Sequence, residues 1–348
     1  MRFLCFGAGA IGTYIGGSLL LQGDSVLFLE RPEVADVIRR NGLTLDLPEG
    51  KKRIAEAQAV GTLREAMESG PFEAAIFAIK SFDTAQAVEE MLPFRKDLPP
   101  LICFQNGVEN EEVLAGAFGW ENVIPATVTS AVGKTGPGEI VLERMRGIGL
   151  SARHTLSQPL FASFQRAGLN PQLYQKPEAM KWSKMLTNLL ANASSAILDM
   201  TPLEIYSDPA LYQLEVKMLK EALKVMRAQK IEVVALPGTP VDWLVRLVEI
   251  LPRRVSQVLL RKALGGGRGG KMPSFHIDLY AGRKKSEVEF LNGAVVRAGE
   301  RLGIPTPVNR VFTQTLLALA QGEIPLEDFN HKPRKLISLV AAEERKHS

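Results

Sequence analysis

The sequence predicts an α/β domain with a doubly wound parallel sheet, followed by an all-α domain. Two observations carry this prediction. Short apolar runs typical of buried strands alternate with helical segments through the first part of the chain, which is the pattern of a parallel sheet with crossover helices. Beyond about residue 175 the chain shows helical periods and no clear strand. The composition changes around 168–177, so we divide the chain into domains of 1–172 and 173–348.

Local signals set the bounds of the predicted elements. The strands are short apolar runs, as expected of strands buried on both faces of a parallel sheet. Pro32 opens a helix and Asn41-Gly42 closes it, while Gly136-Pro137-Gly138 is a turn between two strand-like runs, so the end of the domain is expected to be antiparallel. The predicted strands are 3–6, 24–30, 43–47, 73–79, 101–104 and 122–128, and the predicted helices between them are 13–21, 32–40, 62–68, 83–91 and 111–118.

A Gly-rich segment follows the first predicted strand. Its glycines have the G-x-G-x-x-G spacing and stand directly before a helix, an arrangement that binds the pyrophosphate of a dinucleotide at the helix N-terminus. The first glycine allows the tight turn, the second lets the backbone approach the pyrophosphate, and the third lets the helix pack closely on the strand. An ordinary Gly-rich turn is the alternative. The residues assigned to the cofactor here are Gly7, Ala8, Gly9, Ala10, Ile11 and Gly12.

The end of the second predicted strand indicates which dinucleotide is bound. Glu30 lies about 20 residues beyond the glycines, where an acid accepts a hydrogen bond from the ribose 2′-OH of NAD. Arg31 follows it at once, and a guanidinium binds a 2′-phosphate through paired charged hydrogen bonds. The sequence therefore favours NADPH over NADH, with a solvated loop charge as the alternative for Arg31.

Two further polar segments follow predicted strands, at the edge where open α/β sheets bind their ligands. Lys80 follows strand 73–79 and is placed to meet the phosphates of the cofactor. Asn106-Gly107 follows strand 101–104 and faces the same crevice. A loop lysine and a simple Asn-Gly turn are the alternatives.

The segment 179–198 is predicted to be one mostly buried helix with a polar stripe. Lys184, Asn188 and Asn192 recur every four residues and so share a face, whereas apolar residues fill much of the remainder. Buried polar groups need partners, which a ligand would supply. A lysine in a partly dry pocket can donate a proton and attract a developing oxyanion. Alternatively, Lys184 reaches water and the asparagines bind backbone groups.

The last informative stretch is 271–293. Ser286 with Glu289 three residues later predicts a capping box and the start of a helix, which by itself would explain an acid at Glu287. His276 is a lone histidine and is given no role. The segment 265–270, with five glycines, is predicted to be a flexible connection, either a lid or a hinge.

Composition and charge exclude several classes of protein. The 42 Lys and Arg residues against 38 Asp and Glu give a net charge of +4, too small to argue for nucleic-acid binding. The four histidines show no metal-ligand spacing, and the two cysteines, Cys5 and Cys103, lie in predicted buried strands, which fits a reducing cytoplasm. Glycines interrupt the uncharged run 3–22, so we expect no membrane span. We expect a cytoplasmic protein without metal, nucleic-acid or membrane partners, and its helical half has enough apolar surface for a homodimer.

Taken together, the motifs resemble the ketopantoate reductase (2-dehydropantoate 2-reductase) family over nearly the whole chain, from Gly7 to about Pro307. The resemblance implies a Rossmann-type N-terminal domain and an all-α C-terminal domain like that of 6-phosphogluconate dehydrogenase. It also implies NADPH-dependent reduction of 2-dehydropantoate, a small 2-keto acid, to pantoate for pantothenate and coenzyme A biosynthesis. The motifs, in order, are the G-x-G-x-x-G turn, A-x-K-S-x-D-T at 78–84, Q-N-G-V at 105–108, P-G-x-I at 137–140, K-x-x-x-N at 184–188, P-S at 273–274 with Asp278, and E-x-x-x-L-N-G at 287–293.

The resemblance implies roles for the matching residues. The implied catalytic residues are Lys184, the general acid that protonates the keto oxygen, and Glu287, which holds the nicotinamide ribose or the substrate. The implied substrate-binding residues are Asn106, which also contacts the nicotinamide, Asn188, Asn192 and, for the carboxylate, Ser274. The implied cofactor-binding residues are 7–12, Arg31, Lys80, Asn106, Val132 and Glu287.

The sequence departs from the family pattern on the substrate side. Phe275-His276-Ile277 stands where the family usually has Met-Leu-Gln, Lys271 replaces an asparagine, and Pro202 lies near the place of another. A paralogous NADPH-dependent reductase of a different 2-keto acid is therefore an alternative. A β-hydroxyacid dehydrogenase is a second, although 129–133 lacks the Ser-Gly-Gly loop of that family. A non-catalytic NADPH-binding sensor is a third, against which the intact lysine and asparagine stripe argues.

Overall fold

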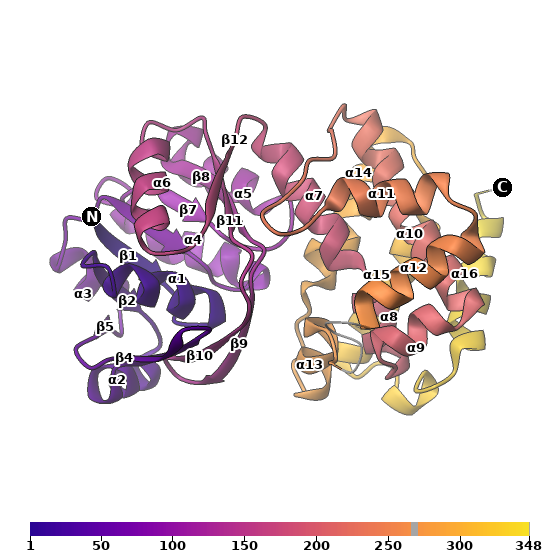
Figure 1. The fold of residues 1–348 in the computed structure, drawn as a ribbon, viewed down its shortest axis with the longest axis horizontal. Helices are drawn as coiled ribbons and strands as arrows, with labels where there is room; N and C mark the ends of the chain where they lie inside the picture. The colour runs from indigo at the N-terminus through magenta and orange to yellow at the C-terminus, as the bar shows by residue number, and fades with distance from the viewer. Residues whose placement is uncertain (266–270, 348) are drawn as a thin grey trace. The chain divides into compact units, whose positions relative to one another are not determined.

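The computed structural model describes residues 1–265 and 271–347, which divide into two compact units (Figure 1). The first unit comprises Met1–Lys181 and Ala235–Pro240, and the second comprises Trp182–Val234 and Val241–Ser348. The boundary predicted from the sequence lies between residues 172 and 173. In the structure the division falls inside helix α7 (Pro177–Leu189), and the loop 235–240 returns to the first unit.

The first unit contains an eight-stranded sheet in the order β12-β11-β8-β7-β6-β1-β2-β5. Every neighbouring pair is parallel except β8 and β11, which are antiparallel. The strand order reverses beside β1, which is the switch point where doubly wound sheets bind ligands. The strands are β1 (Arg2–Phe6), β2 (Ser25–Leu29), β5 (Gln58–Val60), β6 (Ala74–Phe77), β7 (Leu101–Cys103), β8 (Val123–Val128), β11 (Ile148–Ser151) and β12 (Pro171–Tyr174).

Helices cover both faces of this sheet because consecutive residues of its central strands are apolar and their side chains point to opposite faces in turn. Phe3 and Cys5 of β1 pack with α1 and α6 on one face, and Leu4 and Phe6 pack with α3, α4 and α5 on the other. The predicted doubly wound α/β domain is thus confirmed. The helices are α1 (Ala10–Leu20), α2 (Pro32–Asn41), α3 (Leu63–Glu68), α4 (Thr84–Met91), α5 (Asn110–Phe118) and α6 (Ser157–Arg166), with short 3₁₀ turns η1 (Ser81–Asp83), η2 (Leu92–Phe94) and η3 (Trp120–Asn122).

A second, smaller sheet packs against α1 and was not anticipated as a separate layer. Its order is β4-β3-β10-β9, with β3 (Leu43–Leu47) parallel to β10 (Glu139–Arg144). Strand β4 (Gly50–Ile54) pairs antiparallel with β3, and β9 (Ala131–Gly136) pairs antiparallel with β10, which confirms the antiparallel end that the Gly-Pro-Gly turn predicted.

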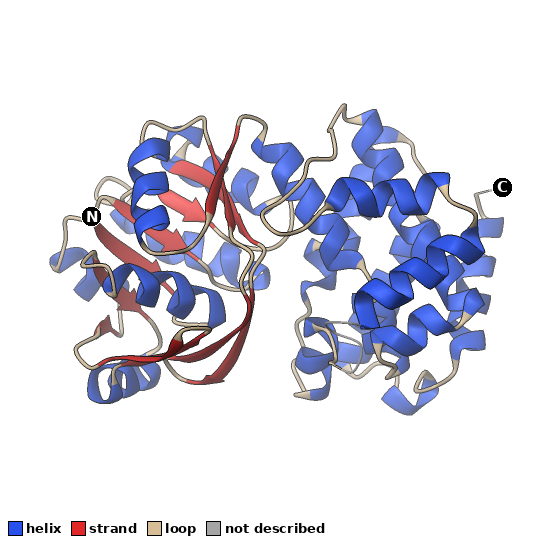
Figure 2. Cartoon of the chain, in the orientation of Figure 1, coloured by secondary structure: helices blue, strands red, loops and turns tan. Residues whose placement is uncertain are grey.

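The second unit is helical, as predicted, and among its described residues no strand occurs (Figure 2). The central helix α10 buries an apolar face that includes Leu211, Leu219 and Ala222. No helix in the described part of the chain is long and apolar enough to cross a lipid bilayer. Besides the C-terminal part of α7, the elements are α8 (Asn192–Leu198), α9 (Pro202–Ser207), α10 (Pro209–Ala228), α11 (Val241–Ile250), α12 (Arg253–Gly265), α13 (Ser274–Tyr280), η4 (Glu287–Phe290), α14 (Asn292–Leu302), α15 (Pro307–Gln321), η5 (Leu326–Asp328) and α16 (Pro333–Arg345).

The prediction of one continuous helix over 179–198 is wrong. Helix α7 ends at Leu189 and α8 begins at Asn192, and Ala191 between them has a left-handed backbone with φ of 48°. The buried Glu215 of α10 stabilises this break, because its carboxylate accepts the Ala191 N–H and the Ser194 hydroxyl, each at 2.7 Å. Asn192 therefore leaves the helical stripe of Lys184 and Asn188 and starts a new helix.

Two other predicted features of the second unit also need comment. Ser286 does cap a helical segment, since its hydroxyl accepts the Val288 N–H at 3.3 Å, but that segment is the 3₁₀ helix η4. The α-helix expected there begins only at Asn292. A flexible Gly-rich connection was predicted over 265–270. Residues 266–270 of it lie outside the described residues.

Candidate functional site

The Gly-rich turn between β1 and α1 has the geometry that a dinucleotide site requires. Gly7 has φ of 89°, a conformation that side chains rarely adopt. A Cβ on Gly12 would lie 1.8 Å from the Gly7 carbonyl oxygen, so only glycine allows this approach of helix to strand. A Cβ on Gly9 would meet nothing within 4 Å, which leaves open space at the helix N-cap. The first turn of α1 has no acidic residue, so its dipole is available to an anion.

The end of β2 presents an acid that is bonded internally and a base that is exposed. Glu30 Oε1 accepts the Ala8 N–H at 2.8 Å, and Oε2 accepts the Arg31 N–H at 3.1 Å. The Arg31 side chain is 76% exposed, and its guanidinium lies 3.8 Å from Oε1 of the likewise exposed Glu33. The arrangement supports a cofactor with an added phosphate, because the guanidinium can turn to such a group at little cost.

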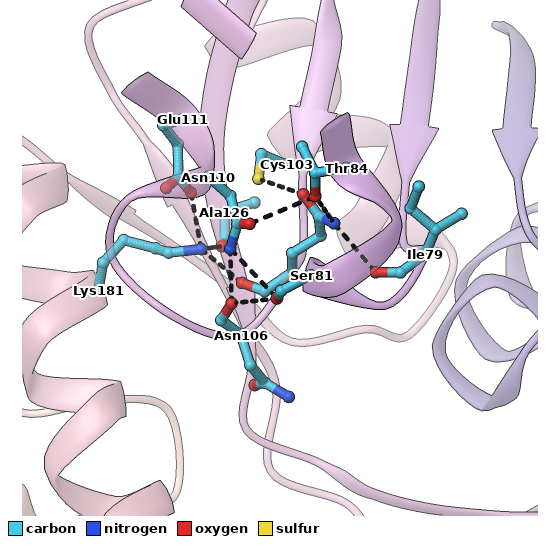
Figure 3. Close-up of polar contacts among 10 residues, drawn as sticks. Ile79, Ser81, Thr84, Cys103, Asn106, Asn110, Glu111, Ala126 and Lys181 are labelled. Atoms are coloured by element: carbon cyan, nitrogen blue, oxygen red, sulfur yellow. Dashed lines mark hydrogen bonds and ion pairs between the residues drawn. The ribbon is translucent and has the colours of Figure 1, made fainter. Parts of the chain in front are cut away.

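Lys80 and Asn106 follow the neighbouring strands β6 and β7. Lys80 is half-buried and precedes the 3₁₀ turn η1. The Asn106 carbonyl oxygen accepts the Ser81 hydroxyl at 2.8 Å and the Asn110 side-chain amide at 2.7 Å. Figure 3 shows the side-chain amide of Asn106 turned away from these contacts, and the residue is exposed. The two predicted loops are therefore joined to each other beyond the carboxyl ends of β6 and β7. Val132 lies half-buried in β9 of the small sheet.

A buried ion pair lies behind Asn106 and was not predicted. The Lys181 Nζ is 2.6 Å from Glu111 Oε1, 2.6 Å from the Gln105 carbonyl oxygen and 3.2 Å from the Ala126 carbonyl oxygen (Figure 3). Burial alone would lower the pKa of Lys181, but the negative charge of Glu111 and its hydrogen bond outweigh this and raise the pKa. Lys181 is therefore held in its charged ammonium form. The sequence signal, a lysine one turn before Lys184, was present but could not reveal its partner.

In the second unit, Asn192 connects two other predicted substrate-binding residues, Asn188 and Ser274. Its Nδ2 donates to the Asn188 carbonyl oxygen at 3.0 Å and lies 3.5 Å from the Ser274 hydroxyl, and its Oδ1 accepts the Phe275 N–H at 3.1 Å. Ser274 is the first residue of α13 and is exposed. The structure thus brings Asn188, Asn192 and Ser274 together, although they lie on three different helices, α7, α8 and α13.

The two predicted catalytic residues lie in different surroundings within this unit. Lys184 is half-buried on α7, one helical turn before Asn188. Glu287 is 4% exposed, at the first position of η4. A carboxylate buried to this degree needs polar partners. Either a bound ligand or groups within the protein can supply them.

His276, which the sequence analysis left without a role, connects α13 to α8. Its Nε2 lies 2.7 Å from Asp199 Oδ1, and its ring stacks on Tyr280 with centroids 4.1 Å apart. Asp199 is the C-cap of α8, the helix that begins with Asn192. The pair therefore fixes the helix that carries Ser274 against the helix that carries Asn192.

Comparison with known proteins shows matches over both units. Residues 3–153 match the model for "Ketopantoate reductase PanE/ApbA" and residues 177–320 match that for its C-terminal domain. The chain is 27% identical over 333 residues to the 2-dehydropantoate 2-reductase of Halobacterium salinarum, covering 93% of this chain and 100% of the relative. It is 24% identical over 314 residues to that of Pyrococcus horikoshii, covering 89% and 94%.

Solved structures share the fold. The PanE/ApbA family ketopantoate reductase of Ralstonia eutropha superposes with a TM-score of 0.78 at 24% identity, over 93% of this chain and 99% of that one. A D-mandelate dehydrogenase in complex with NADH and anilino(oxo)acetate superposes with a TM-score of 0.74 at 19% identity, over 92% and 99%.

Proposed function

Because this chain belongs to the ketopantoate reductase PanE/ApbA family, we propose that it reduces 2-dehydropantoate to pantoate with NADPH. Membership makes the protein an oxidoreductase with a Rossmann-type domain. The observation that carries the substrate proposal is Asn192, which joins Asn188 to Ser274 and so gathers amide and hydroxyl groups suited to a hydroxyl and a carboxylate.

The cofactor proposed is NADPH, bound by residues 7–12 with Arg31, Lys80, Asn106, Val132 and Glu287. The open space at Gly9 accommodates the approach of a pyrophosphate, and the N-terminus of α1 supplies N–H donors to it. The exposed Arg31 takes the 2′-phosphate through charged hydrogen bonds. Glu30 already accepts a hydrogen bond from the Ala8 N–H of the turn, so it is less available to accept one from the ribose 2′-OH of NAD.

Lys184 is the proposed general acid. NADPH, when bound, supplies the hydride that C2 of the keto acid accepts. Negative charge then develops on the keto oxygen, and the Lys184 ammonium stabilises it and donates a proton to give the hydroxyl. Asn188, Asn192 and Ser274 hold the substrate so that one face of the carbonyl is presented. Glu287 holds the nicotinamide ribose or the substrate, and Asn106 contacts both.

Two alternatives are weighed against residues of this chain. A paralogous reductase of another 2-keto acid is favoured by His276, which replaces an apolar residue of the usual pattern and bonds Asp199 beside the carboxylate-binding helix. A β-hydroxyacid dehydrogenase is disfavoured because Ser130, in the place of that family's substrate loop, is buried and accepts the N–H groups of Arg146 and Gly147 at 3.0 Å.

The experiment is NADPH oxidation by the purified protein with ketopantoate beside a panel of other 2-keto acids, repeated with NADH. Turnover of ketopantoate with NADPH supports the proposal. Turnover of a different keto acid supports the paralogue, and the absence of any turnover with NADPH still bound supports a sensor. The expectation of a homodimer stays a prediction, which sedimentation of the same sample tests.

A further inference from the structure

The ammonium of the buried Lys181 lies against oxygen atoms of three different elements, with one ion pair and two hydrogen bonds to backbone carbonyls. An ammonium has three N–H donors. Its three close acceptors are Glu111 in the first turn of α5, the Gln105 carbonyl just after β7, and the Ala126 carbonyl within β8. The Lys181 and Glu111 side chains are 5% and 6% exposed. One side chain thus connects α7 to the segment just after β7 and to the middle of the neighbouring parallel strand β8.

The same contacts determine where Asn106 lies. The Gln105 side-chain Nε2 donates to the Ile79 carbonyl at 3.1 Å and to the Thr84 hydroxyl at 2.8 Å, while its carbonyl accepts from Lys181. The Asn106 carbonyl is bonded by Ser81 and Asn110. The polar groups of this segment that face the interior are therefore bonded there, and the Asn106 side chain is the part that turns outward (Figure 3).

Lys181 also determines the position of the first turns of α7. Lys184 follows three residues later in the same continuous helix, about one turn along it. Fixing Lys181 to the carbonyls of Gln105 and Ala126 therefore fixes the start of α7, the helix that also carries Lys184.

We propose that Lys181 and Glu111 are positioning residues, which hold Asn106 and the start of α7 in place for the reaction without contacting the substrate. This inference rests on the proposed function for its kinetic consequence. Its structural consequence, the ordering of 104–108, does not depend on the substrate.

The test compares the paired variant Lys181→Met/Glu111→Leu with the wild type and with Lys181→Arg. The paired variant removes both buried charges together, because removing one alone would leave the other without its partner and destabilise the protein. We expect the paired variant to remain folded and its kcat to fall by at least about tenfold, since a displacement of about 1 Å can cost roughly 100-fold. The KM for the keto acid should change less than kcat, and Lys181→Arg should restore part of the rate.

A matched control uses Lys217 and Glu344, an ion pair at 2.5 Å in the second unit. The variant Lys217→Met/Glu344→Leu should keep the wild-type kcat. A folded Lys181→Met/Glu111→Leu variant with wild-type kcat would show that the pair is only structural and would overturn the inference.

Hydrogen exchange separates this inference from the proposed function. If the wild type reduces no keto acid, the proposed function fails, but the amides of 104–108 can still be compared. Faster exchange of the 104–108 amides in the paired variant, with no change in α10, supports the positioning role of Lys181 and Glu111. Unchanged exchange of these amides in the paired variant contradicts it.

Discussion

The N–H of Ala8 donates a hydrogen bond to Oε1 of Glu30 at 2.8 Å, which ties the Gly-rich turn to the end of β2. In many dinucleotide-binding domains the acid at this place accepts the ribose 2′-OH instead. Here that carboxylate has a partner within the protein, and the exposed Arg31 stands next to it. The proposed preference for NADPH therefore rests on Arg31, and it can be measured.

Arg31→Ala should weaken NADPH binding and leave NADH use nearly unchanged. A charged hydrogen bond contributes about 1.5–3 kcal/mol, so the KM for NADPH should rise roughly 10- to 100-fold. The exposed side chain contributes little to folding, so the thermal midpoint should not move. Steady-state kinetics with both cofactors measure this, with the exposed Arg64→Ala as the control variant. An equal rise in the KM for NADH and for NADPH would show that Arg31 does not bind the 2′-phosphate.

Gly9→Ala and Gly12→Ala should fail in different ways. A methyl group at Gly12 meets the Gly7 carbonyl oxygen at 1.8 Å, so this variant should be strongly destabilised, by about 1–3 kcal/mol or more. A methyl group at Gly9 meets no protein atom within 4 Å, so that variant should fold normally but bind NADPH weakly, because the methyl occupies the approach of the pyrophosphate. Thermal unfolding and cofactor titration distinguish the two. A Gly9→Ala protein with full affinity would argue against a pyrophosphate at this turn.

Asn192→Ala and Ser274→Ala should distinguish a residue that also stabilises the fold from one that only binds the substrate. Asn192 is buried and accepts the Phe275 N–H, so its loss should cost about 1–3 kcal/mol of unfolding free energy and also lower turnover. Ser274 is exposed, so its loss should change stability by less than about 0.5 kcal/mol while the KM for the keto acid rises. Denaturant unfolding and kinetics of both variants test this. If Ser274→Ala leaves the KM unchanged, the hydroxyl does not bind the carboxylate.

Glu215 and Glu221 should make the protein less stable as the pH rises toward neutrality. Burial raises the pKa of each to about 7 from the usual 4.5, against hydrogen bonds that act in the opposite direction. Between these two values the folded protein binds more protons than the unfolded chain, so the free energy of unfolding falls as the pH increases through that window. The shift corresponds to roughly 3 kcal/mol for each group.

Glu215→Gln tests this dependence because it keeps an acceptor for the Ala191 N–H and removes the ionisation. Denaturant unfolding from about pH 4.5 to pH 7 should show roughly half the wild-type decline, since Glu221 still titrates. Glu221→Gln should show a similar reduction. A Glu215→Gln protein with the full wild-type decline would mean that folding does not raise the pKa of Glu215.

Several features that depend on neighbours in sequence were predicted correctly. The Gly-rich turn is one, because the positive φ of Gly7 and the close approach of Gly12 follow from a strand, a turn and a helix that are contiguous. The alternation of buried strands and helices is another, and it gave the doubly wound sheet and the helical second unit.

Features that depend on distant residues could not be predicted. The helix break at Ala191 needs the carboxylate of Glu215 from α10, and nothing in the periodicity of 179–198 points to it. Lys181 pairs with Glu111, and His276 bonds Asp199, only when the folded chain brings these residues together. The small sheet likewise pairs β3 with β10 from opposite ends of the first domain.

The most direct test of the central claim is the kcat of Lys184→Ala with ketopantoate, measured together with its affinity for NADPH. If Lys184 is the general acid, kcat should fall by about 10²–10⁴-fold while the dissociation constant of NADPH stays within about twofold of the wild type. A Lys184→Ala protein that turns over ketopantoate at close to the wild-type rate would contradict the account.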